Sequence, residues 1–372
     1  MSLLLLCALS AVFAQPQLVK VLSILRHGDR APIATFPNDP NQSEAWPVGW
    51  GQLTTKGMEE LYQQGLKLKK RYVDELKFLN ATYKADETYF RSTDYDRTLA
   101  SAQSMLLGLY CDSEGTYPQT PTWPKRVSPI PVHTVAKNLD HLLYGFRACP
   151  RAIQLGVEQT NSKKFMDYVD AQKDFFAYLT KSSGGFPVRN TTELYYILDP
   201  INCEKIHNLT LAPWMTDAIN EKGQKILERT FGYLHGTAGF GQPENTELMK
   251  LNSGVLLQDV IDRFLSPKEP KFVSYVTHDT TVAVFLFSLG AKRALVGAQN
   301  VDYAVMLALE LWKDKGEFYV SLQYSANASK RLKTVTNAIS GCPSDKLCPL
   351  STFIERCAPY VVKNAEKECM IY

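Results

Sequence analysis

Short apolar runs alternate along the chain with longer segments of helical spacing. Residues 18–25 and 271–277 are rich in β-branched and apolar side chains, as strands buried on both faces of a sheet are. Residues 87–90 form a shorter run of the same kind. A helical pattern starts at Thr54, and another covers residues 280–289. This alternation predicts an α/β fold in which helices flank a mixed, mostly parallel sheet.

The middle of the chain interrupts this alternation. Five prolines in residues 116–135 indicate an extended connection, and residues 138–235 show mostly helical spacing. The strand pattern then returns and ends in a hairpin signal over residues 304–324. We therefore predict one α/β domain, made of residues 15–120 and 243–372, with a smaller helical domain inserted at residues 121–242.

Residues 1–14 have the pattern of a secretory signal peptide. An apolar run of about twelve residues ends at Val12 and Ala14, which occupy the small-residue positions before a cleavage site. The run is too short to span a bilayer, and the alternative interpretation is a buried N-terminal strand. No later run reaches the length of a membrane span, so we expect no membrane anchor, and the leader together with the sequons predicts a secreted protein. Five sequons are predicted glycosylation sites: Asn41, Asn80, Asn190, Asn208 and Asn327.

Composition and charge narrow the range of function classes. Of 372 residues, 45% are hydrophobic and 21% are charged, which excludes a disordered chain and a small disulfide scaffold. The net charge of +3 is too small for a protein that binds nucleic acid through bulk charge. Any anion chemistry must come from a few positive residues that gather locally.

Polar residues directly follow each of the three apolar runs. If the strands are parallel neighbours, their carboxyl ends meet at one edge of the sheet, where open α/β folds bind ligands. Singly, these residues have ordinary interpretations as surface ion pairs, a strand-end histidine or a helix N-cap. We interpret residues 95–97 as helix surface and capping. The predicted crevice would combine six side chains: Arg26, His27, Arg30, Arg91, His278 and Asp279.

This set of side chains suits phosphoryl chemistry. Guanidinium groups match phosphate oxygens in pairs, and three guanidiniums crowded together require an anion between them. A neutral imidazole can attack phosphorus and carry it covalently, which makes His27 the candidate nucleophile. Asp279 is the candidate proton donor to the leaving alkoxide and then the base for the attacking water. Gly28 would let the backbone bend closely around the bound group. The predicted partner is a small-molecule phosphomonoester.

Three sequence blocks resemble the histidine acid phosphatase family. Residues 26–32 (RHGDRAP) resemble its RHGxRxP signature, residues 90–98 (FRSTDYDRT) its second arginine block, and residues 277–281 (THDTT) its His-Asp block. The resemblance extends over nearly the whole chain after residue 14 and is closer to the prostatic and lysosomal branch than to phytases. It implies the same nucleophile and proton donor, and a phosphate-binding set of Arg26, Arg30, Arg91 and His278.

The resemblance carries further implications. It implies an acidic pH optimum, no cofactor, no metal and a homodimer, as is common in the prostatic branch. It also implies two disulfides, which join Cys149 with Cys369 and Cys342 with Cys348. Loss of Cys7 with the leader would leave seven of the eight cysteines, an odd number. At most one further pair could then form among Cys111, Cys203 and Cys357.

Other functions fit the sequence less well than a secreted acid phosphatase does. A phytase-like inositol-phosphate phosphatase would favour a strongly basic rim, and residues 163–174 mix lysines with aspartates. A secreted phosphoester-binding or antigenic protein with incidental catalysis would not need both His27 and Asp279. A phosphate mutase would not need a leader and sequons. A metal-dependent phosphatase would need ligand clusters, and the other histidines show no metal-ligand spacing.

Overall fold

A single mixed sheet forms the centre of the molecule. The structure, a computed structural model, describes residues 15–268 and 270–371. The strand order is β2-β3-β1-β4-β5-β6, and β7 pairs with β5. The strands are β1 (Gln17–Arg26), β2 (Thr88–Ser92), β3 (Phe272–Thr277), β4 (Met306–Asp314), β5 (Glu317–Ser325), β6 (Lys333–Thr334) and β7 (Cys348–Pro349).

The α/β class is confirmed, but the prediction of a mostly parallel sheet is wrong. Only β1 with β3 and β2 with β3 pair in parallel among the described strands. The pairs β1–β4, β4–β5, β5–β6 and β5–β7 are antiparallel. The reason is the predicted hairpin, which turns through Lys315 and Gly316, both at positive φ, and adds its strands beside β1 in the opposite direction.

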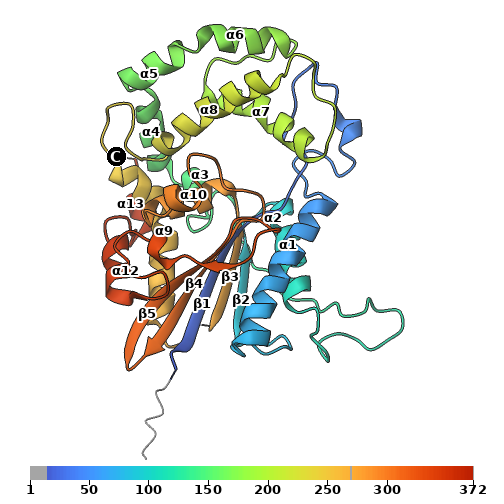
Figure 1. Cartoon of the computed structure of the whole chain (residues 1–372), viewed down its shortest axis with the longest axis vertical. Helices are drawn as coiled ribbons and strands as arrows, with labels where there is room; N and C mark the ends of the chain where they lie inside the picture. Colours follow the sequence, from blue (N-terminus) through green and yellow to red (C-terminus); the bar gives the residue numbers. More distant parts are fainter. Residues whose placement is uncertain (1–14, 269, 372) are drawn as a thin grey trace, which may run out of the picture.

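Helices cover both faces of the sheet (Figure 1). One face carries α1 (Thr55–Leu68), its continuation η2 (Lys69–Glu75) and α2 (Asp96–Leu109). The other carries α9 (Thr246–Leu265), α10 (Asp279–Ser288) and α12 (Leu350–Cys357). The alternation of β1 explains this arrangement, because Val21 and Leu25 enter the first core whereas Leu22 and Ile24 enter the second.

A layer of helices lies beyond the carboxyl ends of β1 and its parallel neighbours (Figure 1). It contains α3 (Gly145–Ala148), α4 (Pro150–Thr160), α5 (Lys163–Asp170), α6 (Lys173–Ser182), α7 (Thr191–Ile206) and α8 (Asp217–Leu234). These helices build a core of their own around Leu179, Leu194 and Ile197, into which Phe36 inserts from the loop that follows β1. The short elements are η1 (Ser43–Ala45), α11 (Lys292–Leu295), η3 (Thr336–Ala338) and α13 (Ala365–Glu368).

Two disulfides close the fold, and both match the pairs implied by the resemblance. One joins Cys149 to Cys369, so that the start of α4 is tied to the end of the chain, and the other joins Cys342 to Cys348. The remaining described cysteines, Cys111, Cys203 and Cys357, are unbonded, so the possible third pair is not formed.

The structure describes the five sequon asparagines but not the predicted leader. The predicted signal peptide, residues 1–14 with Cys7, lies outside the described residues. Within the described ones, no helix combines the length and apolar character needed to cross a membrane. Asn80, Asn190 and Asn208 are exposed and Asn327 is half-buried, whereas Asn41 is buried and its amide donates to Thr210 O. A sugar on Asn41 would displace that hydrogen bond, so its side chain is the least suited to glycosylation.

Candidate active site

The parallel pairing of β1 and β3 brings two of the sequence blocks together. Arg26 is the last residue of β1 and lies opposite Thr277, the last residue of β3. His27 N donates to Thr277 O over 2.9 Å, so the two strand ends are joined where the polar residues begin. His278 and Asp279 follow at the N-terminus of α10, with His278 at the N-cap and Asp279 as the first helical residue.

His27 is buried and held in one tautomer. Its Nδ1 lies 2.8 Å from Gly28 O, and because a carbonyl only accepts, Nδ1 must carry the proton. Nε2 therefore holds the lone pair. Burial and the positive charge of the neighbouring Arg26 and Arg97 lower the pKa of His27 well below its ordinary value. Burial and these charges therefore favour the neutral imidazole.

Gly28 serves a packing role that the sequence did not indicate. A Cβ on Gly28 would lie 2.3 Å from Gly57 O on α1, so the β1 end and α1 approach each other backbone to backbone. Thr54, the N-cap of α1, reinforces this contact because its hydroxyl donates to Asp29 Oδ2 over 2.6 Å. His207 Nε2 contacts the same carboxylate oxygen at 2.6 Å. The loop behind His27 is therefore fixed by α1 and by the end of α7.

Asp279 is an ionised carboxylate held by three donors. Its Oδ2 lies 2.9 Å from Arg26 Nη2 and accepts from Asn300 Nδ2 over 3.0 Å, and its Oδ1 accepts from Thr280 N over 2.7 Å. Burial favours the neutral acid, but the charge of Arg26, with smaller contributions from His278, Arg30 and the Thr280 N–H, lowers the pKa of Asp279 to about 2.

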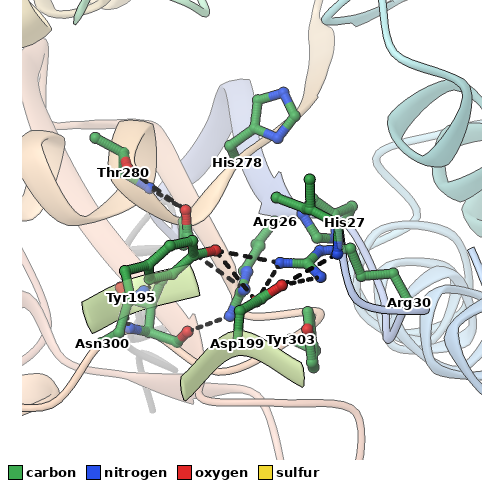
Figure 2. Close-up of polar contacts among 12 residues, drawn as sticks. Arg26, His27, Arg30, Tyr195, Asp199, His278, Thr280, Asn300 and Tyr303 are labelled. Carbon is green, nitrogen blue, oxygen red and sulfur yellow. Dashed lines mark hydrogen bonds and ion pairs between the residues drawn. The ribbon is translucent and has the colours of Figure 1, made fainter. Parts of the chain in front are cut away.

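Arg30 links the strand end to the helical layer. Its two Nη atoms form a fork with Asp199 of α7, at 2.7 Å to Oδ1 and 3.1 Å to Oδ2. Tyr195 OH lies 3.3 Å from Arg30 Nη2 and donates to the same aspartate. Figure 2 shows this cluster beside Arg26 and His27. The side chain of Arg30 is only 3% exposed, so its orientation depends on that ion pair.

His278 completes the polar cluster as a second neutral imidazole. Burial and the charge of Arg97 lower the pKa of His278 to about 3. Its Nε2 lies 3.1 Å from Thr93 Oγ1, and its ring packs against the ring of Tyr95 at 4.9 Å between centroids. The centroids of the His27 and His278 rings are 5.5 Å apart.

The second block contains two arginines, Arg91 and Arg97, and the structure gives them different partners. Arg97, in the first turn of α2, is half-buried, and its Nη2 lies 3.5 Å from His278 Nδ1. Arg91 instead forms an ion pair with Asp140. It lies on the face of β2 that carries Tyr89, next to Tyr275 of β3. The interpretation of residues 95–97 as surface and capping is therefore wrong for Arg97, because the helix start turns its side chain toward the strand ends.

Several contributors to the site were not foreseen from the sequence. Tyr303 lies under Arg26, with the guanidinium 4.1 Å from its ring centroid. Asp199, Tyr195 and Asn300 also reach the site from segments distant in the chain. Only Arg97, which lies five positions after the end of β2 in a block already singled out, offered a usable signal. In residues 15–268 and 270–371, no three His, Cys, Asp or Glu side chains form a candidate metal-ligand group.

Comparison with known proteins places this site in a family. The model of the histidine phosphatase superfamily (branch 2) matches residues 17–325. Human prostatic acid phosphatase is 36% identical over 359 residues, which cover 94% of this chain and 87% of that protein. Human lysosomal acid phosphatase is 32% identical over 359 residues, with 94% and 80% covered.

Solved structures agree on the fold. Hafnia alvei phytase in complex with myo-inositol hexakis sulphate superposes with a TM-score of 0.67 at 19% identity, over 96% of this chain and all of that one. A phytase of Klebsiella sp. ASR1 gives a TM-score of 0.64 at 17% identity, over the same shares of the two chains. The chain belongs to the histidine phosphatase superfamily, branch 2. Within it, the chain is a homologue of the prostatic and lysosomal acid phosphatases.

Proposed function

We propose that the protein hydrolyses phosphate monoesters at acidic pH through a covalent phosphohistidine on His27. The observation that carries this proposal is the state of the imidazole, which is buried and neutral and holds its proton on Nδ1. Its Nε2 is the only ring nitrogen with a free lone pair for attack on phosphorus. The names of the relatives, prostatic and lysosomal acid phosphatase, support the same reaction class.

The phosphate group would be bound by Arg26, Arg30, Arg97 and His278. Two of these guanidiniums are neutralised by Asp279 and Asp199, so they tolerate their mutual proximity. A bound phosphate would share these guanidinium donors, and His278 would act through Arg97, whose Nη2 lies 3.5 Å from His278 Nδ1, without adding positive charge. Such fixed donors stabilise the charge on the equatorial oxygens of the transferring phosphoryl group. In this proposal Arg97 takes the role that the resemblance gave to Arg91.

Protonation of the leaving group is assigned to Asp279. Nε2 of His27 forms a bond to phosphorus while the ester P–O bond breaks, and Asp279 gives its proton to the departing alkoxide. Water then attacks the phosphohistidine, Asp279 takes a proton from it, and inorganic phosphate leaves. Asp279 is ionised in the free site, and the negative charge of the bound phosphate near Arg26 raises its pKa. This requirement for a protonated carboxyl in the complex favours activity at acidic pH.

The proposal is tested by trapping the intermediate. Wild-type protein mixed with radiolabelled phenyl phosphate and quenched rapidly should carry one acid-labile, alkali-stable phosphate on the peptide that contains His27. His27→Ala should lack both the label and turnover, whereas His133→Ala, which changes an exposed histidine away from the site, should keep both. A His27→Ala protein that folds and still turns over would refute the nucleophile.

The substrate class, the passage through the secretory pathway and the oligomeric state need separate tests. A panel of phosphomonoesters that includes phytate, a nucleotide and an aryl phosphate, assayed from pH 4 to 8, distinguishes a general acid phosphatase from a phytase-like enzyme. Passage through the secretory pathway is proposed because the fold forms two disulfides, which persist in oxidising compartments. Light scattering of the purified protein tests the expected homodimer.

A further inference from the structure

A loop outside the three sequence blocks contacts the proposed proton donor. It runs from Val296 to Val301, between α11 and β4. Its Asn300 donates from Nδ2 to Asp279 Oδ2 over 3.0 Å, and its Oδ1 accepts from Val301 N over 2.8 Å. The second contact fixes the orientation of the amide, because Oδ1 must face the backbone N–H. The NH₂ group therefore faces Asp279 as a donor, and Figure 2 shows Asn300 at the edge of the cluster.

The loop is anchored on both sides of Asn300. Before it, the buried Lys292 donates from Nζ to Gly297 O over 3.0 Å and to Gln299 O over 2.6 Å. After it, Arg26 Nη1 donates to Val301 O over 2.6 Å. Asn300 itself is exposed, so its side chain is not placed by burial in a core. Its position follows from the fixed backbone on either side.

We propose that Asn300 is a positioning residue for Asp279, which fixes the rotation of the carboxyl group and supplies a neutral donor to Oδ2 when the substrate phosphate draws on Arg26. The inference rests on the proposed function, because it assigns Asp279 the protonation of the leaving group. Arg26 makes the charged contact to the same oxygen at 2.9 Å. A phosphate bound by Arg26 weakens the ion pair between Arg26 and Asp279. The amide N–H of Asn300 then keeps the Asp279 carboxyl group in its orientation.

The neutrality of the amide matters for the proton. A cation at this position would hold Asp279 ionised in the complex, and a carboxylate would raise its affinity for a proton. A neutral amide changes the proton affinity of Asp279 less than either charged group would, and it still donates the hydrogen bond. The charged and titratable groups that face Asp279 come from five elements: Arg26 and Arg30 from the end of β1, Arg97 from α2, Tyr195 from α7, His235 from α8 and His278 from the start of α10.

The test uses two substitutions that both remove the amide donor and differ in the charge that they leave beside Asp279. Asn300→Ala removes the donor, and we expect kcat/KM at pH 5 to fall about tenfold on an alkyl phosphate and less than twofold on p-nitrophenyl phosphate, whose leaving group needs no proton. Asn300→Asp keeps the shape and the contact to Val301 N but places a carboxylate beside Asp279. It should move the alkaline limb of the kcat profile on the alkyl phosphate upward by about one pH unit.

Gln299→Asp is the matched control, since it adds the same charge on the neighbouring exposed side chain. It should leave the leaving-group dependence and the pH profile unchanged. Equal losses on both substrates for Asn300→Ala, or an unshifted profile for Asn300→Asp, would overturn the role of Asn300. Failure of the proposed function has a different signature, because His27→Ala would then retain turnover. Thermal unfolding of each variant within a few degrees of wild type establishes that the fold is intact.

Discussion

Arg26 Nη2 and Asp279 Oδ2 lie 2.9 Å apart and join the last residue of β1 to the first residue of α10. The pair connects two sequence blocks that are more than 250 positions apart in the chain. It places the proposed proton donor against a guanidinium whose charge also lowers the pKa of His27. The same contact therefore stabilises the folded protein and sets the protonation state of the site.

Asp279→Asn should reveal both effects. The pKa of Asp279 lies below its unfolded value, so the carboxylate stabilises the folded protein above about pH 4, and this stability is lost as pH falls toward 2. The variant should have a lower Tm than wild type at pH 6, and the difference should narrow toward pH 2. Turnover of alkyl phosphates should fall on the order of 10²–10⁴-fold. Calorimetry at both pH values and steady-state kinetics measure these effects, and a pH-independent Tm difference would contradict the assignment.

Substitutions of Arg97 and Arg91 should have different effects, although the two residues lie in one sequence block. Arg97→Ala should lower kcat/KM on the order of 10²–10³-fold, by analogy with the loss of one transition-state donor, and should weaken inhibition by inorganic phosphate. Arg91→Ala leaves the buried Asp140 without its counter-charge and should mainly lower the Tm. Phosphate inhibition constants and thermal unfolding of both variants are the measurements. Loss of phosphate binding in a stably folded Arg91→Ala protein would return the role to Arg91.

Glu204 gives a pH dependence that is independent of the active site. Burial and the neighbouring Asp39 carboxyl raise the pKa of Glu204 to about 9. The folded state therefore keeps a proton that the unfolded chain releases above about pH 4.3, and stability falls as pH rises through this window. Glu204→Gln carries no such penalty. Its Tm should match wild type at pH 4.5 and exceed it at pH 8, whereas Glu355→Gln, at an exposed position, should show no such trend.

The predictable part of the site is the part that local sequence fixes. Arg26, His27, His278 and Asp279 lie at or directly after the ends of buried strands, and the parallel pairing of those strands makes them neighbours. The side-chain direction of Arg91 was not predictable, because it depends on the register of β2 against β3, which no local pattern reveals. The antiparallel edge of the sheet escaped prediction for a similar reason. A hairpin signal predicts how β4 pairs with β5, and it does not predict how β4 pairs with β1.

A second group of site residues could not be predicted from the sequence: Asp199, Tyr195 and Asn300. Each reaches the site from the helical layer or from a loop, and each is an ordinary polar residue in its own segment. Their relation to the site exists only after α7 and the loop before β4 have packed against the strand ends. Sequence spacing within one segment carries no information about such contacts.

Asp199 offers a direct test of how the helical layer contributes to anion binding. Asp199→Asn removes the counter-charge of Arg30, whose side chain is 3% exposed, and should lower the free energy of unfolding by about 3–5 kcal/mol. Inorganic phosphate can then replace the missing negative charge, because its oxygens share the same guanidinium. Phosphate should therefore raise the Tm of Asp199→Asn more than that of wild type, which thermal scans over a phosphate titration measure. Equal increases in the two proteins would show that the phosphate does not reach Arg30, and they would remove this residue from the proposed binding set.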